Sequence, residues 1–209
     1  TMELVYNLNS VIDVNEYPVE QARITNLKHR PIGIGVQGLA DVFAKFKYVW
    51  GSKESRNLNI AIFETIYYYA CLKSHEMAMQ DGSYELFKGS PISQGIFQFD
   101  MWNVTPTIRY NWVALREKVK LGMRNSLLIA PMPTASTAQI LGNNESIEMY
   151  TAMIYSRRVL SGEFYVVNKF LVEDLRVLGL WDKEMVDEIM INRGSIQKIT
   201  RIPEYLKNI

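Results

Sequence analysis

The chain has 209 residues, of which 48% are hydrophobic and 22% charged, enough for a globular domain with a sizeable core. Its formal net charge of +1 gives no electrostatic argument for a nucleic acid or an anionic membrane as a partner. The single cysteine excludes an internal disulfide and a cysteine-rich zinc site, and no apolar run approaches the ~20 residues of a membrane span.

Amphipathic spacing predicts a helix over residues 2–14, whereas residues 20–30 are polar and lack a clear period. We expect no signal peptide before the first helix. Because the sequence starts and stops within predicted elements, we expect it to be a piece of a longer protein.

Residues 33–38 match the pattern G-x-G-x-x-G of dinucleotide-binding loops. That function requires a strand immediately before the glycines and a carboxylate at the end of a second strand about twenty residues later. Residues 28–31 are polar and end in proline, and the later region begins a helix, so neither condition is met. We therefore interpret the glycines as serving tight turns and close packing, followed by a helix over residues 37–46.

Ser52 is a plausible N-cap for a long helix that reaches about Gln80 and ends at Asp81-Gly82. The helix is apolar on more than one face, which predicts burial on several sides and makes Cys71 an inert core thiol. Residues 84–107 are aromatic and irregular. Such a loop binds a base or a protein, or more often packs over a neighbouring element; a helix over residues 111–121 follows.

Residues 126–141 read as a short buried strand, a turn with two prolines and a helix that starts with hydroxyl residues. Thr134, Ser136 and Thr137 stand at the predicted helix start, where free backbone N–H groups bind anions readily. The same residue types are also ordinary helix N-caps. Spacing alone favours the N-cap interpretation over a phosphate site.

The last third contains a polar turn over residues 142–146, a strand over 163–167, and helices over 168–178 and 182–191. Arg157 and Arg158 either assist a phosphate site or cover the surface and pair with acids. The acidic residues of the two helices are predicted to lie on solvated faces rather than to form a catalytic pair: Glu173, Asp174, Glu184, Asp187 and Glu188. Helices separated by short buried strands indicate an α/β fold, with parallel strands and crossover helices as the default.

Four long segments, residues 29–41, 100–107, 124–148 and 157–164, strongly resemble the large subunit of class I ribonucleoside-diphosphate reductase of the eukaryotic type. The resemblance extends over essentially all residues in the same order. One departure is Met149, where the family usually has proline.

The resemblance implies that residues 1–209 are a single, helix-rich fragment of the C-terminal half of the catalytic α/β barrel. It implies that the diphosphate of the substrate is bound by Pro133, Thr134, Ala135, Ser136 and Thr137. The allosteric region, the radical-cysteine loop and the C-terminal tail of the family are expected outside these residues. The fragment then holds no catalytic residue and no metal ligand, and we expect it to be inactive alone and to self-associate.

Further properties follow from the resemblance alone. The family reduces ribonucleoside diphosphates by a thiyl-radical mechanism, uses a metal and radical cofactor in a small subunit, and is controlled by allosteric ATP and deoxynucleotides. Thioredoxin or glutaredoxin is the reductant, the large subunits form dimers or higher oligomers, and the location is cytoplasmic. We expect no cofactor on this fragment and no nucleic-acid or membrane partner. Two alternatives stay open: a non-catalytic nucleotide- or phosphate-binding α/β module, and a helical interaction protein that uses the aromatic loop.

Overall fold

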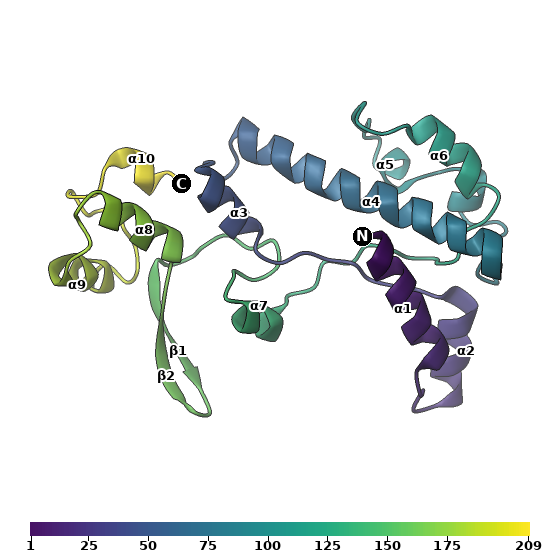
Figure 1. Ribbon diagram of the computed structural model, residues 1–209, viewed down its shortest axis with the longest axis horizontal. Coiled ribbons are helices and arrows are strands. Elements are labelled where there is room, and N and C mark those ends of the chain that lie inside the picture. Colours follow the sequence, from purple (N-terminus) through teal and green to yellow (C-terminus); the bar gives the residue numbers. More distant parts are fainter. The chain divides into compact units, whose positions relative to one another are not determined.

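The structure is a computed structural model that describes residues 1–158 and 160–209. Helices dominate these residues, and the named strands form a two-stranded sheet (Figure 1). The elements in chain order are α1 (Met2–Val14), α2 (Glu20–His29), α3 (Leu39–Phe46), α4 (Lys53–Asp81), a 3-10 turn (Ile92–Gln94), α5 (Gln98–Met101), α6 (Trp112–Val119), α7 (Ala135–Leu141), β1 (Ile154–Val159), β2 (Gly162–Val167), α8 (Lys169–Val177), α9 (Lys183–Ile191) and α10 (Glu204–Lys207).

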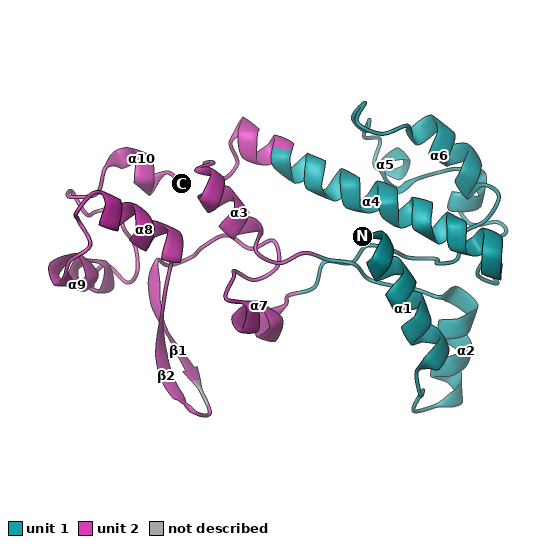
Figure 2. Cartoon of the chain, viewed as in Figure 1, with its two compact units in different colours: residues 1–35, 58–132 teal, residues 36–57, 133–209 magenta. Residues whose placement is uncertain are grey.

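The chain forms two compact units, which Figure 2 distinguishes by colour. Unit 1 contains residues 1–35 and 58–132, and unit 2 contains residues 36–57 and 133–209. Most of the predicted helices are present within about two residues of their expected ends. The predicted cap at Ser52 also forms, since Ser52 Oγ accepts the N–H of Ser55 at 3.2 Å. At the start of α9, Asp182 Oδ1 accepts the N–H of Met185 at 2.7 Å in the same way.

Helix α2 was not predicted as an element, and the structure shows why. None of its residues is buried, so no apolar stripe marks it in the sequence. It lies beside α1, and an exposed ion pair between Arg23 and Glu20 supports its first turn. Arg30 ends the helix in a left-handed conformation with φ of 46°.

The core of unit 1 is formed by residues from more than one face of α4, among them Ile66, Tyr68 and Cys71, together with the segments that pack on them. Phe97 is fully buried, and its ring centroid lies 5.2 Å from those of Phe99 and Trp112. The aromatic loop over residues 84–107 therefore packs over neighbouring helices, as expected, although Trp102 remains 68% exposed. This packing accounts for the aromatic character of the loop without a ligand.

The strand predicted over residues 126–130 is present as a short extended segment with a parallel partner. Ile34 N–H donates to Leu128 O at 2.9 Å, Ala130 N–H donates to Ile34 O at 3.0 Å, and Ile34 forms a parallel bridge with Ile129. Its partner is thus the glycine motif itself, which the sequence did not indicate. A Cβ on Gly33 would lie 3.0 Å from the Cβ of Ala130, which confirms that this glycine serves close packing.

A buried polar network ties the start of that segment to α1 and α4. The side-chain amides of Asn9 and Asn125 exchange two hydrogen bonds of 3.0 Å, and Ser74 Oγ donates to Asn125 Oδ1 at 2.9 Å. Asn125 Nδ2 also donates to Arg30 O at 2.8 Å, while the Arg30 side chain donates to Asp13 Oδ1 at 2.6 Å. We call these five residues the buried network. It satisfies polar groups that would otherwise be costly inside unit 1.

Unit 2 has a second core, centred on the inner faces of α8 and α9. Leu175, Met185 and Ile189 are completely buried there. The predicted strand over residues 163–167 is present as β2, which pairs antiparallel with β1, with Ile154 opposite Val167. The parallel default does not apply to this pair, because so short a connection between strands permits only an antiparallel hairpin.

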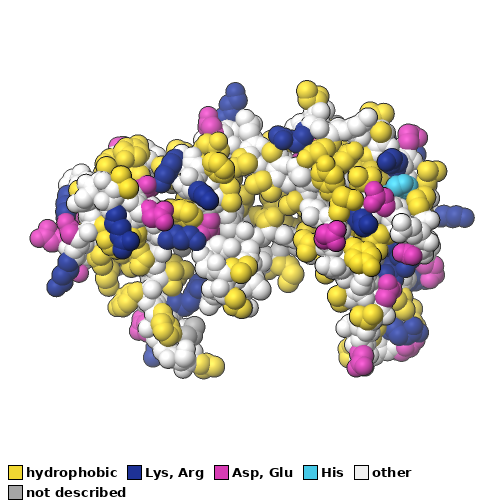
Figure 3. Space-filling view, viewed as in Figure 1, with side chains coloured by type: hydrophobic (Ala, Val, Ile, Leu, Met, Phe, Trp, Pro, Cys, Tyr) yellow, Lys and Arg dark blue, Asp and Glu magenta, His cyan; other side chains and the backbone are white. Residues whose placement is uncertain are grey.

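Large hydrophobic side chains reach the surface of both units (Figure 3). Ile108 and Leu121 are exposed in unit 1, and Ile140 and Leu160 in unit 2. None of the helices described is both long enough and apolar enough to cross a membrane.

Candidate functional site

The site expected at residues 133–137 lies in unit 2, at the start of α7. Thr134 occupies the N-cap position with φ of 56°, in the left-handed region that a β-branched residue rarely adopts. Its carbonyl accepts the first helical hydrogen bond, from Ala138 N–H at 2.9 Å. The N–H groups of Ala135, Ser136 and Thr137 precede that bond, and none of them donates to a protein group within the described residues. Three backbone donors are therefore available at one place.

The hydroxyl groups of this segment do not cap the helix. Thr134 Oγ1 accepts the backbone N–H of Ser146 at 2.8 Å, so its own proton is left to donate elsewhere. Thr137 Oγ1 donates to Gln37 Oε1 at 2.9 Å, and the exposed Ser136 hydroxyl bonds to no described residue. The interpretation of these residues as ordinary N-caps is therefore wrong, because α7 has no side-chain cap bond.

The loop that follows α7 is held against the segment before α3. Gly38 N–H donates to Asn144 O at 2.9 Å, and Asn144 N–H donates to Asp41 Oδ2 at 2.6 Å. A Cβ on Gly38 would lie 3.3 Å from the Cβ of Asn143, and its φ of 78° favours glycine. The third glycine of the motif thus lets this loop approach closely. Sequence reasoning missed Gln37 and Asp41, although both stand in the segment that carried the family resemblance.

Arg157 and Arg158 were expected either to assist a phosphate site or to cover the surface and pair with acids. Arg157 Nη2 lies 3.2 Å from Glu145 Oε1, and its guanidinium lies 5.6 Å from the ring centroid of Tyr155. Arg158 is exposed on β1, opposite Glu163 in the strand register. Pairing with an acid and covering the surface is therefore the observed role of Arg157. A cation that was not predicted, Lys169, donates to Gly142 O at 2.9 Å at the other end of α7.

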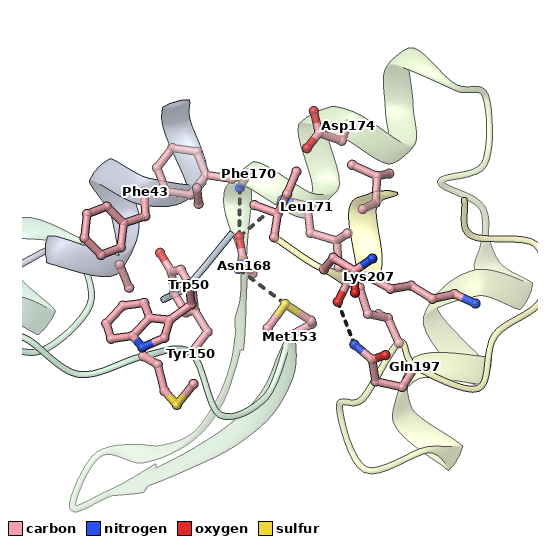
Figure 4. A pocket seen from close by; sticks show the side chains of 17 residues that line it. Phe43, Trp50, Tyr150, Met153, Asn168, Phe170, Leu171, Asp174, Gln197 and Lys207 are labelled. Atoms are coloured by element: carbon pink, nitrogen blue, oxygen red, sulfur yellow. Dashed lines mark hydrogen bonds between the residues drawn. The ribbon is translucent and has the colours of Figure 1, made fainter. Parts of the chain in front are cut away.

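A cavity of about 270 Å³ opens elsewhere in unit 2 (Figure 4). Its wall carries the aromatic rings of Phe43, Trp50 and Tyr150, and none of residues 133–137 lines it. The polar groups at the cavity are engaged with the protein, since Asn168 Oδ1 accepts the N–H groups that start α8 and Gln197 Nε2 donates to a backbone carbonyl at 2.7 Å. The cavity and the expected phosphate site are therefore separate.

The remaining candidate groups are structural. Cys71 is 1% exposed, and burial raises the pKa of its thiol to about 12. His75 is buried, with Nδ1 3.1 Å from Gly122 O. The predicted solvated faces are observed for Glu173 and Asp187, whereas Asp174 is half-buried and forms an ion pair with Lys47. Across residues 1–158 and 160–209, no His, Cys, Asp or Glu side chains are grouped as metal ligands.

Comparison with known proteins gives a match over the whole chain. The family model "Ribonucleotide reductase, barrel domain" matches residues 2–209, so the chain belongs to the ribonucleotide reductase barrel-domain family. This confirms the expected fold class, a helix-rich part of an α/β barrel, and one family model spans both compact units.

The relatives share a name as well as a fold. A ribonucleoside-diphosphate reductase large subunit of Dictyostelium discoideum is 59% identical over 211 residues, covering 100% of this chain and 24% of that protein. Large subunits of Caenorhabditis elegans and of variola virus are 58% and 55% identical, and 27% of each is covered. The chain thus spans about a quarter of the length of these curated relatives.

Proposed function

We propose that this chain works as a segment of a ribonucleoside-diphosphate reductase large subunit, in which residues 133–137 bind the diphosphate of the substrate. The activity is the reduction of ribonucleoside diphosphates to deoxyribonucleoside diphosphates for DNA synthesis. The observation that carries the proposal is the set of unengaged donors at the start of α7, inside a segment that belongs to a chain-long match with large subunits.

The donors suit a multiply charged anion. The N–H groups of residues 135–137 point from one helical turn, and the hydroxyl protons of Thr134 and Ser136 add two more donors. Hydrogen bonds to an ionised phosphate are shorter and stronger than those between neutral groups. Because α7 has only 7 residues, its dipole adds little, and the individual donors supply most of the attraction. Pro133 has no N–H to satisfy and restricts the backbone just before the site.

The proposal assigns the radical chemistry to other parts of the large subunit. Cys71 is the one cysteine of the chain, and its thiol is buried in the core of unit 1. Its high pKa keeps it protonated, and burial keeps substrate away. A small radical-generating subunit, allosteric ATP and deoxynucleotides, and a thioredoxin or glutaredoxin reductant belong to the proposed complete enzyme. The proposed setting is a cytoplasmic dimer or higher oligomer of large subunits.

The proposal is tested in a complete large subunit that contains this chain. A suitable protein is the Dictyostelium discoideum large subunit with its matching segment replaced by these 209 residues, assayed with its small subunit. The replacement of Thr134, Ser136 and Thr137 by alanine removes three hydroxyls. We expect kcat/KM for ribonucleoside diphosphates to fall at least about 100-fold, because a hydrogen bond to a charged group is worth about 1.5–3 kcal/mol and the loss of two such bonds already exceeds the roughly 2.7 kcal/mol that 100-fold represents.

A matched control replaces three exposed hydroxyl residues elsewhere, Ser10, Ser156 and Thr200, by alanine. It is expected to keep kcat/KM within about twofold, since such surface changes cost little. Unchanged kcat/KM in the Thr134, Ser136 and Thr137 variant would refute the diphosphate assignment. A chimera that folds but never reduces ribonucleotides would instead favour a non-catalytic phosphate-binding module. The 209-residue chain alone is expected to show no turnover, and measurable reduction by it would contradict its role as a segment.

A further inference from the structure

One hydrogen-bonded chain of side chains connects the proposed diphosphate site to the glycine motif. Thr137 Oγ1 donates to Gln37 Oε1 at 2.9 Å, and Gln37 Nε2 donates to Asn143 Oδ1 at 3.1 Å. Gln37 and Asn143 are half-buried, whereas Thr137 is exposed. All three residues lie in unit 2. We call them the side-chain relay.

The observed direction of the relay is unfavourable for an anion. A hydroxyl has a single proton, and Thr137 donates it to Gln37 Oε1 at 2.9 Å, with Thr134 O at 3.4 Å as a more distant acceptor. In this arrangement the proton is not available to an anion. A primary amide, by contrast, has a donor end and an acceptor end. If the Gln37 amide turned over, its Nε2 would donate to Thr137 Oγ1 and release the hydroxyl proton for a phosphate oxygen.

Besides the two bonds of the relay, the reversal gives up only the long hydrogen bond of 3.4 Å from Thr137 Oγ1 to Thr134 O. The side chain of Asn143 bonds only to Gln37, so its amide can turn as well and donate from Nδ2 to Gln37 Oε1. The relay contains two hydrogen bonds before the reversal and two after it. After the reversal, a phosphate oxygen also accepts a hydrogen bond from the Thr137 hydroxyl. The orientation of each amide is set by its hydrogen-bond partners, which makes both directions chemically equivalent within the relay.

We propose that Gln37 is a positioning residue that, together with Asn143, sets the direction of the Thr137 hydroxyl, and that a bound diphosphate reverses the relay. This inference rests on the proposed function of residues 133–137. The neighbouring backbone fixes the place of Gln37 in the relay. The next residue, Gly38, donates to Asn144 O at 2.9 Å and allows Asn143 to approach within contact distance.

The first experiment measures the affinity of the chimeric large subunit for cytidine diphosphate by calorimetry. Gln37→Met keeps the length of the side chain but can neither donate nor accept through an amide, and Thr137→Val keeps the shape without the hydroxyl. We expect Thr137→Val to weaken binding about tenfold, because it removes the hydroxyl. Gln37→Met releases the hydroxyl proton from its acceptor, so its affinity should stay within about threefold of the wild type, and the double variant should match Thr137→Val. Gln139→Met, on an exposed glutamine of α7 that makes no side-chain hydrogen bond, is the matched control and should leave affinity unchanged.

A second variant gives a readout that a purely structural role would not change. Gln37→Glu introduces a group that only accepts while ionised, which locks the Thr137 hydroxyl in the unfavourable direction. The ratio of wild-type to variant affinity should therefore exceed about tenfold at pH 8 and fall as the pH approaches the ordinary glutamate pKa of about 4.3, where half of the introduced carboxyls are protonated. Gln139→Glu, which places the same charge on α7 outside the relay, should lose less affinity at pH 8. The ratio for Gln37→Met should not depend on pH.

The outcomes separate the relay from the proposed function. Unchanged affinity in Thr137→Val, a loss of about tenfold or more in Gln37→Met, or a pH-independent ratio for Gln37→Glu would each overturn the relay. If those results came with a large loss in the Thr134, Ser136 and Thr137 alanine variant, the diphosphate site would stand without the relay. If that triple variant also bound normally, the proposed function itself would fail.

Discussion

Each unit contains a network of polar groups, and the two networks differ in whether their donors are all bonded within the protein. In unit 1, the buried network joins amide, hydroxyl and guanidinium groups, and both ends of the Asn125 amide are used inside the protein. In unit 2, the same kinds of groups surround the start of α7, but three backbone N–H groups and two hydroxyl protons bond to no described residue. One network is closed, and the other is open toward solvent.

The difference teaches where a ligand is expected. A buried polar group without a partner is costly, so buried polar groups are nearly always hydrogen-bonded within the protein. A network whose groups are all bonded in this way has no free donor for a substrate. A half-exposed network can leave donors to water at little cost and exchange that water for an anion.

The largest expected effect on stability comes from opening the buried network. Asn125→Ala leaves the carbonyl of Arg30 and the hydroxyl proton of Ser74 without a partner in a buried place, and removes two hydrogen bonds from Asn9. It should lower the free energy of unfolding by about 3–5 kcal/mol. The matched change in the open network, Asn143→Ala, should cost less than about 1 kcal/mol. Urea unfolding of both variants measures the difference. Equal losses would remove the distinction between the two networks.

A smaller effect is expected from the close packing between the glycine motif and residues 126–131. Gly33→Ala places a Cβ 3.0 Å from the Cβ of Ala130 and should cost about 1–3 kcal/mol in unfolding free energy. Ala130→Gly in the same chain should restore most of it. For Gly35→Ala, where the Cβ meets the backbone of Pro131 at 3.0 Å, the Ala130→Gly change should give little rescue. Rescue of both variants, or of neither, would contradict this packing.

The smallest effect is a difference in pH dependence. The hydrogen bonds from Arg30 hold the pKa of Asp13 below its ordinary value. A lowered carboxyl pKa stabilises the folded chain above the unfolded-state pKa near 4, and that contribution is lost as the pH falls through the lowered folded pKa. Because Asp13 is half-exposed, the contribution is below about 1 kcal/mol.

The check is urea unfolding of wild type and Asp13→Asn from pH 6 to pH 3. The wild type should lose its advantage over the variant across the acid part of this range. The side-chain relay has no ionisable group, so Gln37→Met should shift stability equally at every pH. An advantage of the wild type that persists undiminished at pH 3 would show that Asp13 stabilises by other means.

The sequence predicts local features of this molecule better than distant pairings. Helices α4 and α9 follow from apolar stripes and from the caps Ser52 and Asp182, all of which are encoded within a few residues. Helix α2 has no buried face, so its sequence carries no period to find. The pairing of Ile34 with Ile129 joins segments far apart in the chain, and neither segment alone specifies its partner.

The same limit applies to the candidate site. The hydroxyl residues at the start of α7 were visible in the sequence, and the resemblance selected them as diphosphate ligands. Their available donors were not visible, because the bond between Thr134 and Ser146 depends on how the following loop folds back. Gln37 was hidden for the same reason, since its partners Thr137 and Asn143 lie about half the chain away.

The most direct test of the account compares two ligands that differ only in their phosphates. Cytidine and cytidine diphosphate are titrated into the chimeric large subunit and into its Thr134, Ser136 and Thr137 alanine variant. We predict that the substitutions weaken cytidine diphosphate about 100-fold and leave cytidine unchanged, because only the phosphates meet these residues. Equal affinities of the two proteins for cytidine diphosphate, or an equal loss for both ligands, would contradict the central claim that residues 133–137 bind the substrate diphosphate.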